Sequence, residues 1–293
     1  MDGDSHFRSL KDSANISRRA FALTSLATGF AIGPGPVNAQ AVITTDADGL
    51  VAGEVRVPVA GGEAPAYRAK PARGSGFGTV LVVHEVWGVH EHFKDVCRRF
   101  AKAGYYAISI DLFARLGNAA AVAEIPQLIS TIVAPTPDAQ IMADLDAAAA
   151  FAGRDGADAT KLAITGFCWG GRIVWMYAAH RHGLKAGVAW YGPLNFQPGP
   201  ARPRQPRDVA GELHAPVLGL YAGDDTGIPQ DQVEQLRAAL RAANSRSEIV
   251  VVPGVPHGFY ADYRASYRAE AARMGWDRML DWFRRNGVTP ASS

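Results

Sequence analysis

The sequence has few cysteines, little excess charge and no long apolar run. Its 293 residues include two cysteines, Cys97 and Cys168, which could form at most one disulfide, so a disulfide-rich scaffold is excluded. Lys and Arg number 30 against 28 Asp and Glu, and this balance gives no electrostatic case for nucleic-acid binding. The apolar stretch 20–32 is too short and too rich in glycine and alanine to favour a permanent membrane span. Cys97 lies beside Phe93 and Phe100 in an expected amphipathic helix, which predicts a core residue.

The N-terminus does carry an export address. Arg18 and Arg19 precede an uncharged apolar stretch, and small residues around Ala39 and Ala41 form an Ala-x-Ala-like cleavage site. This combination predicts a twin-arginine signal peptide over residues 1–39, with cleavage after Ala39 or Ala41. The protein would then be periplasmic or secreted. The alternative is an N-terminal tail in which two arginines fall together by chance.

Short apolar runs alternate with amphipathic stretches through residues 40–293. Strands are expected at 50–59, 66–71, 79–83, 106–110, 161–165, 184–190, 216–222 and 248–252. Helices are expected at 91–103, 138–152, 172–180, 230–243 and 267–285, with a partly helical loop at 116–136 and an exposed proline-rich loop at 195–210. This alternation predicts a single α/β domain, a mostly parallel sheet with helices on both faces.

The segment 166–171, Gly-Phe-Cys-Trp-Gly-Gly, is the most informative part of the chain. It has the Gly-x-nucleophile-x-Gly pattern of a nucleophile elbow, with Cys168 where serine is usual. Such a turn from strand to helix holds its central residue at an unfavourable backbone angle, and flanking glycines avoid collisions. The helix N-terminus is expected to favour a thiolate. The alternative is an inert cysteine, since free cysteines are commonly buried.

A thiol nucleophile needs a base, and the base needs an orienting acid. In an elbow-type hydrolase the chain order is nucleophile, acid, histidine, each at the carboxyl end of a strand. Asp225 follows the expected strand 216–222, and His257 follows the expected strand 248–252. Both therefore stand where that order requires them. Asp224 is the rival for Asp225.

The loop after the expected strand 79–83 supplies two further candidates. An oxyanion hole needs two backbone N–H groups, expected from Trp169, directly after the nucleophile, and from about Val86 in this loop. Glu85 is unusual there, because it would put a carboxylate near the sulfur of Cys168. The alternative for Glu85 is a solvated loop acid.

At these residues the chain resembles the dienelactone hydrolase family (carboxymethylenebutenolidase-like), within the α/β-hydrolase superfamily, over about residues 50–288. The motifs that carry the resemblance are His84-Glu85-x-x-Gly88, Asp111-Leu112-Phe113-Ala114-Arg115, Gly166-Phe167-Cys168-Trp169-Gly170-Gly171, Tyr191-Gly192, Gly223-Asp224-Asp225 with Pro229, and His257-Gly258-Phe259. The resemblance implies an α/β-hydrolase fold and a triad of Cys168, Asp225 and His257. It also implies that Glu85 holds the resting cysteine and that Arg115 binds a substrate carboxylate.

One position departs from the family's pattern. A second substrate arginine lies four residues after the histidine in the best-known members, but that position is Ala261 here and the nearest arginine is Arg264. This departure puts dienelactone itself in doubt as the substrate.

The predicted function is a hydrolase that opens lactones or cleaves small carboxylic esters through a Cys-His-Asp triad and an acyl-enzyme. The alternative is a non-catalytic exported binding protein on the same scaffold, and a redox thiol is a more distant possibility. No cofactor, metal or nucleic acid is expected, only a small lactone or ester. The mature chain is expected to have no membrane span and to be a monomer or a homodimer.

Overall fold

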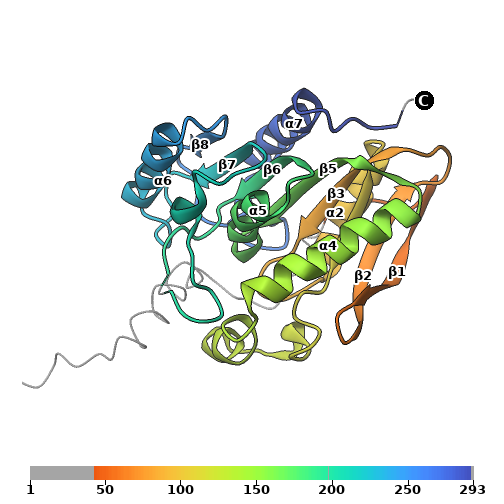
Figure 1. Ribbon diagram of the computed structural model, residues 1–293, viewed down its shortest axis with the longest axis horizontal. Coiled ribbons are helices and arrows are strands. Elements are labelled where there is room, and N and C mark those ends of the chain that lie inside the picture. Colours follow the sequence, from red (N-terminus) through yellow and green to blue (C-terminus); the bar gives the residue numbers. More distant parts are fainter. Residues whose placement is uncertain (1–42, 197, 292–293) are drawn as a thin grey trace, which may run out of the picture.

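The computed structural model describes residues 43–196 and 198–291, so the predicted signal peptide lies outside the described residues. One sheet has the spatial order β1-β2-β4-β3-β5-β6-β7-β8 (Figure 1). The strands are β1 Leu50–Val59, β2 Gly62–Pro71, β3 Phe77–Val83, β4 Tyr106–Ile110, β5 Ala157–Phe167, β6 Leu184–Trp190, β7 Val217–Ala222 and β8 Glu248–Val252. β2 pairs antiparallel with β1 and β4, and the other pairs are parallel. The sheet is therefore mostly parallel, as predicted.

Helices cover both faces of the sheet. They are α2 Glu91–Lys102, α3 Ile125–Leu128, α4 Asp138–Arg154, α5 Trp169–His180, α6 Gln230–Ala242 and α7 Ala269–Arg285. Figure 1 shows α4 and α5 on the near face and α2 behind the sheet, where Phe100 of α2 packs on Trp276 and Phe283 of α7. Within residues 43–196 and 198–291, no helix combines the length and the hydropathy that a membrane span needs.

The central strands form the core and align the functional edge. Every residue of β3 and β4 is buried, as expected for β-branched and apolar runs covered on both faces. Cys97 on α2 is also fully buried and free, so it is the core residue that the sequence predicts. Because β3, β5, β6, β7 and β8 run parallel, their carboxyl ends meet at one edge. The segments after these strands therefore lie close together.

The two long connections have more structure than the sequence indicates. Segment 116–136 contains the 3-10 helix η2 Ala119–Ala121, α3 and the π-helix η3 Ile129–Val133. Segment 195–210 ends in the 3-10 helix η4 Pro206–Val209, and both ends of η4 are buried. The prediction of an exposed loop is wrong there, because Gln205 and Asp208 form a capping box that starts η4.

Candidate active site

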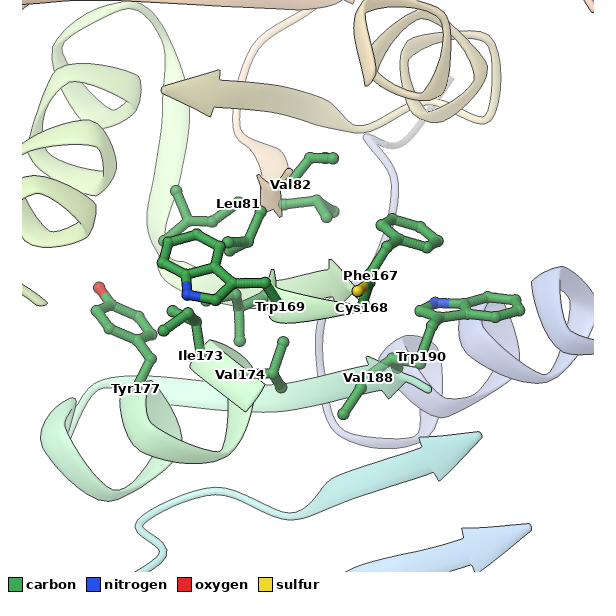
Figure 2. Close-up of a cluster of buried hydrophobic side chains, with 14 of the residues drawn as sticks. Leu81, Val82, Phe167, Cys168, Trp169, Ile173, Val174, Tyr177, Val188 and Trp190 are labelled. Carbon is green, nitrogen blue, oxygen red and sulfur yellow. The ribbon is translucent and has the colours of Figure 1, made fainter. Parts of the chain in front are cut away.

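Cys168 stands at a strained turn between the end of β5 and the start of α5. Its φ is 51° and its ψ is −120°, a conformation that a non-glycine residue adopts only when its surroundings impose it. The flanking glycines permit the turn, because a Cβ on Gly166 would lie 2.2 Å from the Gly170 oxygen, and one on Gly170 would lie 2.6 Å from the His84 oxygen. Figure 2 shows Cys168 beside Phe167, within the buried cluster that also includes Trp169 and Trp190. The elbow geometry predicted from the glycine pattern is therefore present.

The resting Cys168 is a neutral thiol. Burial raises its pKa well above the ordinary value, and the carboxylate of Glu85 raises it further. The Arg264 guanidinium and a hydrogen bond with the Trp169 backbone lower the pKa, but they do not outweigh burial. The backbone at the helix N-terminus does favour a thiolate, as expected, but burial outweighs this effect, because a charged sulfur would be desolvated here.

Asp225 and His257 come together from the ends of β7 and β8. The Asp225 Oδ2 lies 2.7 Å from the His257 Nδ1. The other Asp225 oxygen accepts hydrogen bonds from the backbone N–H groups of Gly227, at 2.9 Å, and Ile228, at 3.1 Å. Asp224 is exposed, so the choice of Asp225 over this neighbour agrees with the geometry. A carboxylate fixed by backbone donors can orient the imidazole and stabilise its charged form.

Glu85 is buried in the turn after β3, which rules out the alternative of a solvated loop acid. Its Oε2 accepts a hydrogen bond from the Tyr263 hydroxyl at 2.7 Å and an ion-paired one from Arg264. Within the described part of the chain, its Oε1 has no hydrogen-bond partner. Arg264 stacks on Trp87, 4.9 Å from the ring centroid. Burial disfavours the charged Arg264, but the Glu85 carboxylate raises its pKa and keeps it protonated.

The expected oxyanion donors lie beside the sulfur and in the buried turn. Trp169 is the first residue of α5, and its backbone N–H donates a hydrogen bond to the sulfur of Cys168. Val86 is fully buried directly after Glu85. The Trp169 indole stacks on the His84 ring with centroids 5.6 Å apart, and this contact joins the start of α5 to the turn after β3. The role of the two N–H groups toward an oxyanion stays a prediction.

Arg115 is held by an acid and by a backbone oxygen. Its guanidinium forms a bidentate ion pair with Asp144 of α4, in which Nη2 lies 2.8 Å from Oδ1. It also donates a hydrogen bond to the backbone oxygen of Ala60, between β1 and β2. Asp144 is buried, so the pair neutralises a carboxylate that would otherwise be costly. The guanidinium of Arg115 is therefore held by Asp144 and Ala60, whereas the charge of Arg264 acts on the Cys168 sulfur. The sequence identified Arg264 as the nearest arginine but gave it no role.

Tyr191 is a site residue that sequence reasoning left without a role. It follows β6 with φ 38°, and its ring lies 5.0 Å from that of His257. Its hydroxyl is buried and lacks a hydrogen-bond partner among the residues described. Burial raises its pKa, and the Glu85 carboxylate adds to the effect. In the sequence, the Tyr191-Gly192 motif was the available sign of this position. Gly192 packs so closely on the elbow that a Cβ there would lie 2.4 Å from the Gly171 carbonyl carbon.

Residues 43–196 and 198–291 contain no group of three or more histidine, cysteine, aspartate or glutamate side chains that could hold a metal ion. The chemistry that these residues can perform is that of a thiol, an imidazole and two carboxylates. Such a set is suited to nucleophilic attack on a carbonyl with proton transfer.

The chain is similar to known proteins over nearly all of its length. Residues 64–287 match the Dienelactone hydrolase family. The protein named "Putative carboxymethylenebutenolidase" from Methylorubrum extorquens is 54% identical over 286 residues, which cover 97% of this chain and 98% of that one. A protein of the same name from Escherichia coli is 50% identical over 265 residues, which cover 90% and 97% of the two chains.

Two solved structures share the fold. The crystal structure of a "Putative Dienelactone Hydrolase" from Klebsiella pneumoniae is 52% identical with a TM-score of 0.79, and the match covers 80% of this chain and 99% of that one. A thermostable carboxylesterase from a metagenomic library has a TM-score of 0.63 at 19% identity, and the match covers 94% and 99% of the two chains. The sheet of this chain is thus the sheet of an α/β-hydrolase fold.

Proposed function

This chain belongs to the dienelactone hydrolase family, and on that premise we propose that it opens lactones or cleaves small carboxylic esters through Cys168, His257 and Asp225. The observation that carries the proposal is the 2.7 Å contact between His257 and Asp225 at the edge where the strained Cys168 emerges. An imidazole oriented by a carboxylate is the base that a neutral thiol requires.

In the proposed acylation, His257 takes the thiol proton and the Cys168 sulfur attacks the substrate carbonyl. The backbone N–H groups of Trp169 and Val86 stabilise the oxyanion, and one such donor is typically worth about 10²–10³ in rate. His257 then gives the proton to the leaving oxygen, so that the C–O bond breaks and a thioester forms. A water molecule, deprotonated by His257, attacks the thioester, and the thiol is restored with release of the acid.

For Glu85 we propose the role that the family resemblance implies, to hold the resting cysteine and help form the thiolate when substrate binds. Its carboxylate raises the Cys168 pKa, and Tyr263 and Arg264 hold it in place. A thiol kept protonated is also a poor target for oxidants, because oxidation follows thiolate character. Glu85 would therefore keep the thiol protonated at rest and help to form the thiolate when substrate binds.

A substrate with a carboxylate is favoured by the cation beside the sulfur. The relatives' name, carboxymethylenebutenolidase, denotes a lactone with an acidic side group. Arg115 is the candidate from the family pattern, and Arg264 is the candidate from the geometry. Both guanidiniums are ion-paired, Arg264 with Glu85 and Arg115 with Asp144, but the charge of Arg264 is the one that lowers the pKa of Cys168, which places Arg264 nearer the reacting sulfur.

We also propose that residues 1–39 direct twin-arginine export to the periplasm or beyond. The paired Arg18 and Arg19 before an apolar stretch support this proposal. Replacing both arginines with lysine should leave the precursor in the cytoplasm, as fractionation and immunoblotting would reveal. An unchanged periplasmic yield would count against export by this route.

The test of the function is hydrolysis of p-nitrophenyl acetate, dihydrocoumarin and dienelactone by residues 40–293. Cys168→Ala should abolish turnover and keep the melting temperature, whereas Cys97→Ala, a change of the other buried cysteine, should leave the rate per folded molecule unchanged. Mass spectrometry of the quenched reaction should detect an acyl group on Cys168. Lactone binding without turnover would instead favour the alternative, an exported binding protein.

A further inference from the structure

A second histidine–aspartate pair lies beneath the site. The His92 Nδ1 of α2 is 2.9 Å from the Asp262 Oδ1, in the loop after β8. The two side chains are 1% and 0% exposed. The other Asp262 oxygen accepts an ion-paired hydrogen bond from Arg99 at 2.5 Å, and Arg99 also donates to Asp95 at 2.6 Å. His92, Arg99 and Asp262 are called the anchor cluster below.

The anchor cluster is not a second catalytic dyad. The His92 ring packs against Phe93 and Tyr263, each with centroids 5.1 Å apart, and against Tyr260 at 5.9 Å. Its Nε2 is buried without a hydrogen-bond partner in the residues described. The Asp262 carboxylate is already neutralised by Arg99. The pair is thus walled in by aromatic rings, where no substrate could reach it.

The anchor cluster fixes a short loop whose next two residues reach the site. Tyr263 and Arg264 directly follow Asp262, and both donate hydrogen bonds to Glu85. The Arg264 N–H donates to the Ala261 oxygen at 2.9 Å, so the backbone on either side of Asp262 is closed into a turn. A buried carboxylate with two cationic or hydrogen-bonding partners is costly to displace. The position of Asp262 therefore limits where Arg264 and Tyr263 can lie.

We propose that the anchor cluster is a positioning device for the active site, which holds Tyr263 and Arg264 against Glu85 and thereby sets the charges around the Cys168 sulfur. The proposal rests on the proposed function in that it takes Cys168 as the nucleophile. In this proposal His92, Arg99 and Asp262 do not touch the substrate. They act by holding Tyr263 and Arg264 in place.

A double-mutant cycle on kcat/KM for p-nitrophenyl acetate tests this action. Asp262→Asn should lower kcat/KM about 10-fold in the wild-type background, and less than about 2-fold in an Arg264→Gln background, because coupled residues of one network are not additive. Asp155→Asn is the matched control. It disrupts another ion-pair cluster, with Arg68 and Lys70, so it should lower stability yet leave kcat/KM within about 2-fold in both backgrounds.

Several outcomes would overturn the proposal. An equal loss in both backgrounds, or no loss in either, would show that Asp262 does not act through Arg264. If Asp262→Asn fails to fold, His92→Gln removes one partner and keeps Arg99, and the same cycle applies. A crystal structure of the variant gives a readout without turnover: the Arg264–Glu85 contact should be lost or lengthened, and an unchanged contact refutes the proposal. A wild-type protein that hydrolyses no ester would refute the proposed function instead.

Discussion

The two histidine–aspartate pairs of this molecule have nearly the same bond and different surroundings. The edge pair, His257–Asp225, has its atoms 2.7 Å apart, with side chains 9% and 1% exposed. The anchor pair, His92–Asp262, has them 2.9 Å apart, with side chains 1% and 0% exposed. The bond alone therefore does not make a catalytic pair. What decides is whether the other ring nitrogen can exchange a proton with a reacting group.

The second partner of each carboxylate explains the difference. The remaining oxygen of Asp225 accepts from the uncharged backbone N–H groups of Gly227 and Ile228, which leave the negative charge of the acid available to an imidazolium at His257. The remaining oxygen of Asp262 accepts from the Arg99 guanidinium, which neutralises the acid before His92 is considered. The edge pair is thus suited to take up a proton, and the anchor pair is suited to stay fixed.

Activity should separate the pairs most strongly. We expect His257→Ala to lower kcat by about 10³-fold or more, because the base and the acid of every step are lost. His92→Gln should lower it only about 10-fold, through the displaced Arg264. Steady-state kinetics on p-nitrophenyl acetate measure both. Similar losses in the two variants would erase the distinction between the pairs.

Stability should rank the pairs in the opposite order. Asp262→Ala removes a buried acid from His92 and from the half-buried Arg99, which keeps Asp95, so we expect a loss of about 3 kcal/mol, the lower end of the cost of breaking a buried pair. Asp225→Ala leaves two backbone donors unsatisfied, which costs about 1–3 kcal/mol. Urea unfolding followed by tryptophan fluorescence gives the two free energies. A larger loss for Asp225→Ala would mean that the anchor cluster does not hold the fold together.

The two arginines sharpen the comparison, because Arg264 joins the anchor cluster to the site and Arg115 belongs to neither pair. We expect Arg264→Gln to raise KM for a carboxylated lactone about 10- to 150-fold over its effect on a neutral ester, the scale of a hydrogen bond to a charged group. Arg115→Gln should lower stability through Asp144 and change the two KM values alike. A selective rise for Arg115→Gln would instead make it the carboxylate reader.

The sequence predicted the edge pair better than the anchor pair. Cys168, Asp225 and His257 each follow a strand, and strands can be read from β-branched runs, so their meeting at one edge follows from chain order. His92 and Asp262 are 170 positions apart and lie in a helix and a loop, where no local pattern marks a pair. The ion pair of Arg115 with Asp144 was not predictable for the same reason, because Asp144 lies on another element with no signal in the sequence.

The smallest expected effect is a loss of stability at low pH that comes from Asp262 of the anchor pair. Burial by itself raises the pKa of Asp262, but the hydrogen bond from His92 and the charge of Arg99 outweigh it and hold this pKa below its ordinary value. A carboxyl whose folded pKa is depressed stabilises the fold above its unfolded pKa, about 3.9, and loses that contribution as the pH falls through the folded value.

Wild-type protein should therefore lose stability more steeply below about pH 4 than Asp262→Asn, which has no proton to bind at this position. Urea midpoints measured at pH 6, 4 and 3 follow the difference between the two proteins, which should narrow toward the lowest pH. If the two curves stay parallel from pH 6 to pH 3, the charge on Asp262 contributes nothing to the anchor cluster. The cluster would then hold the loop through shape and packing alone.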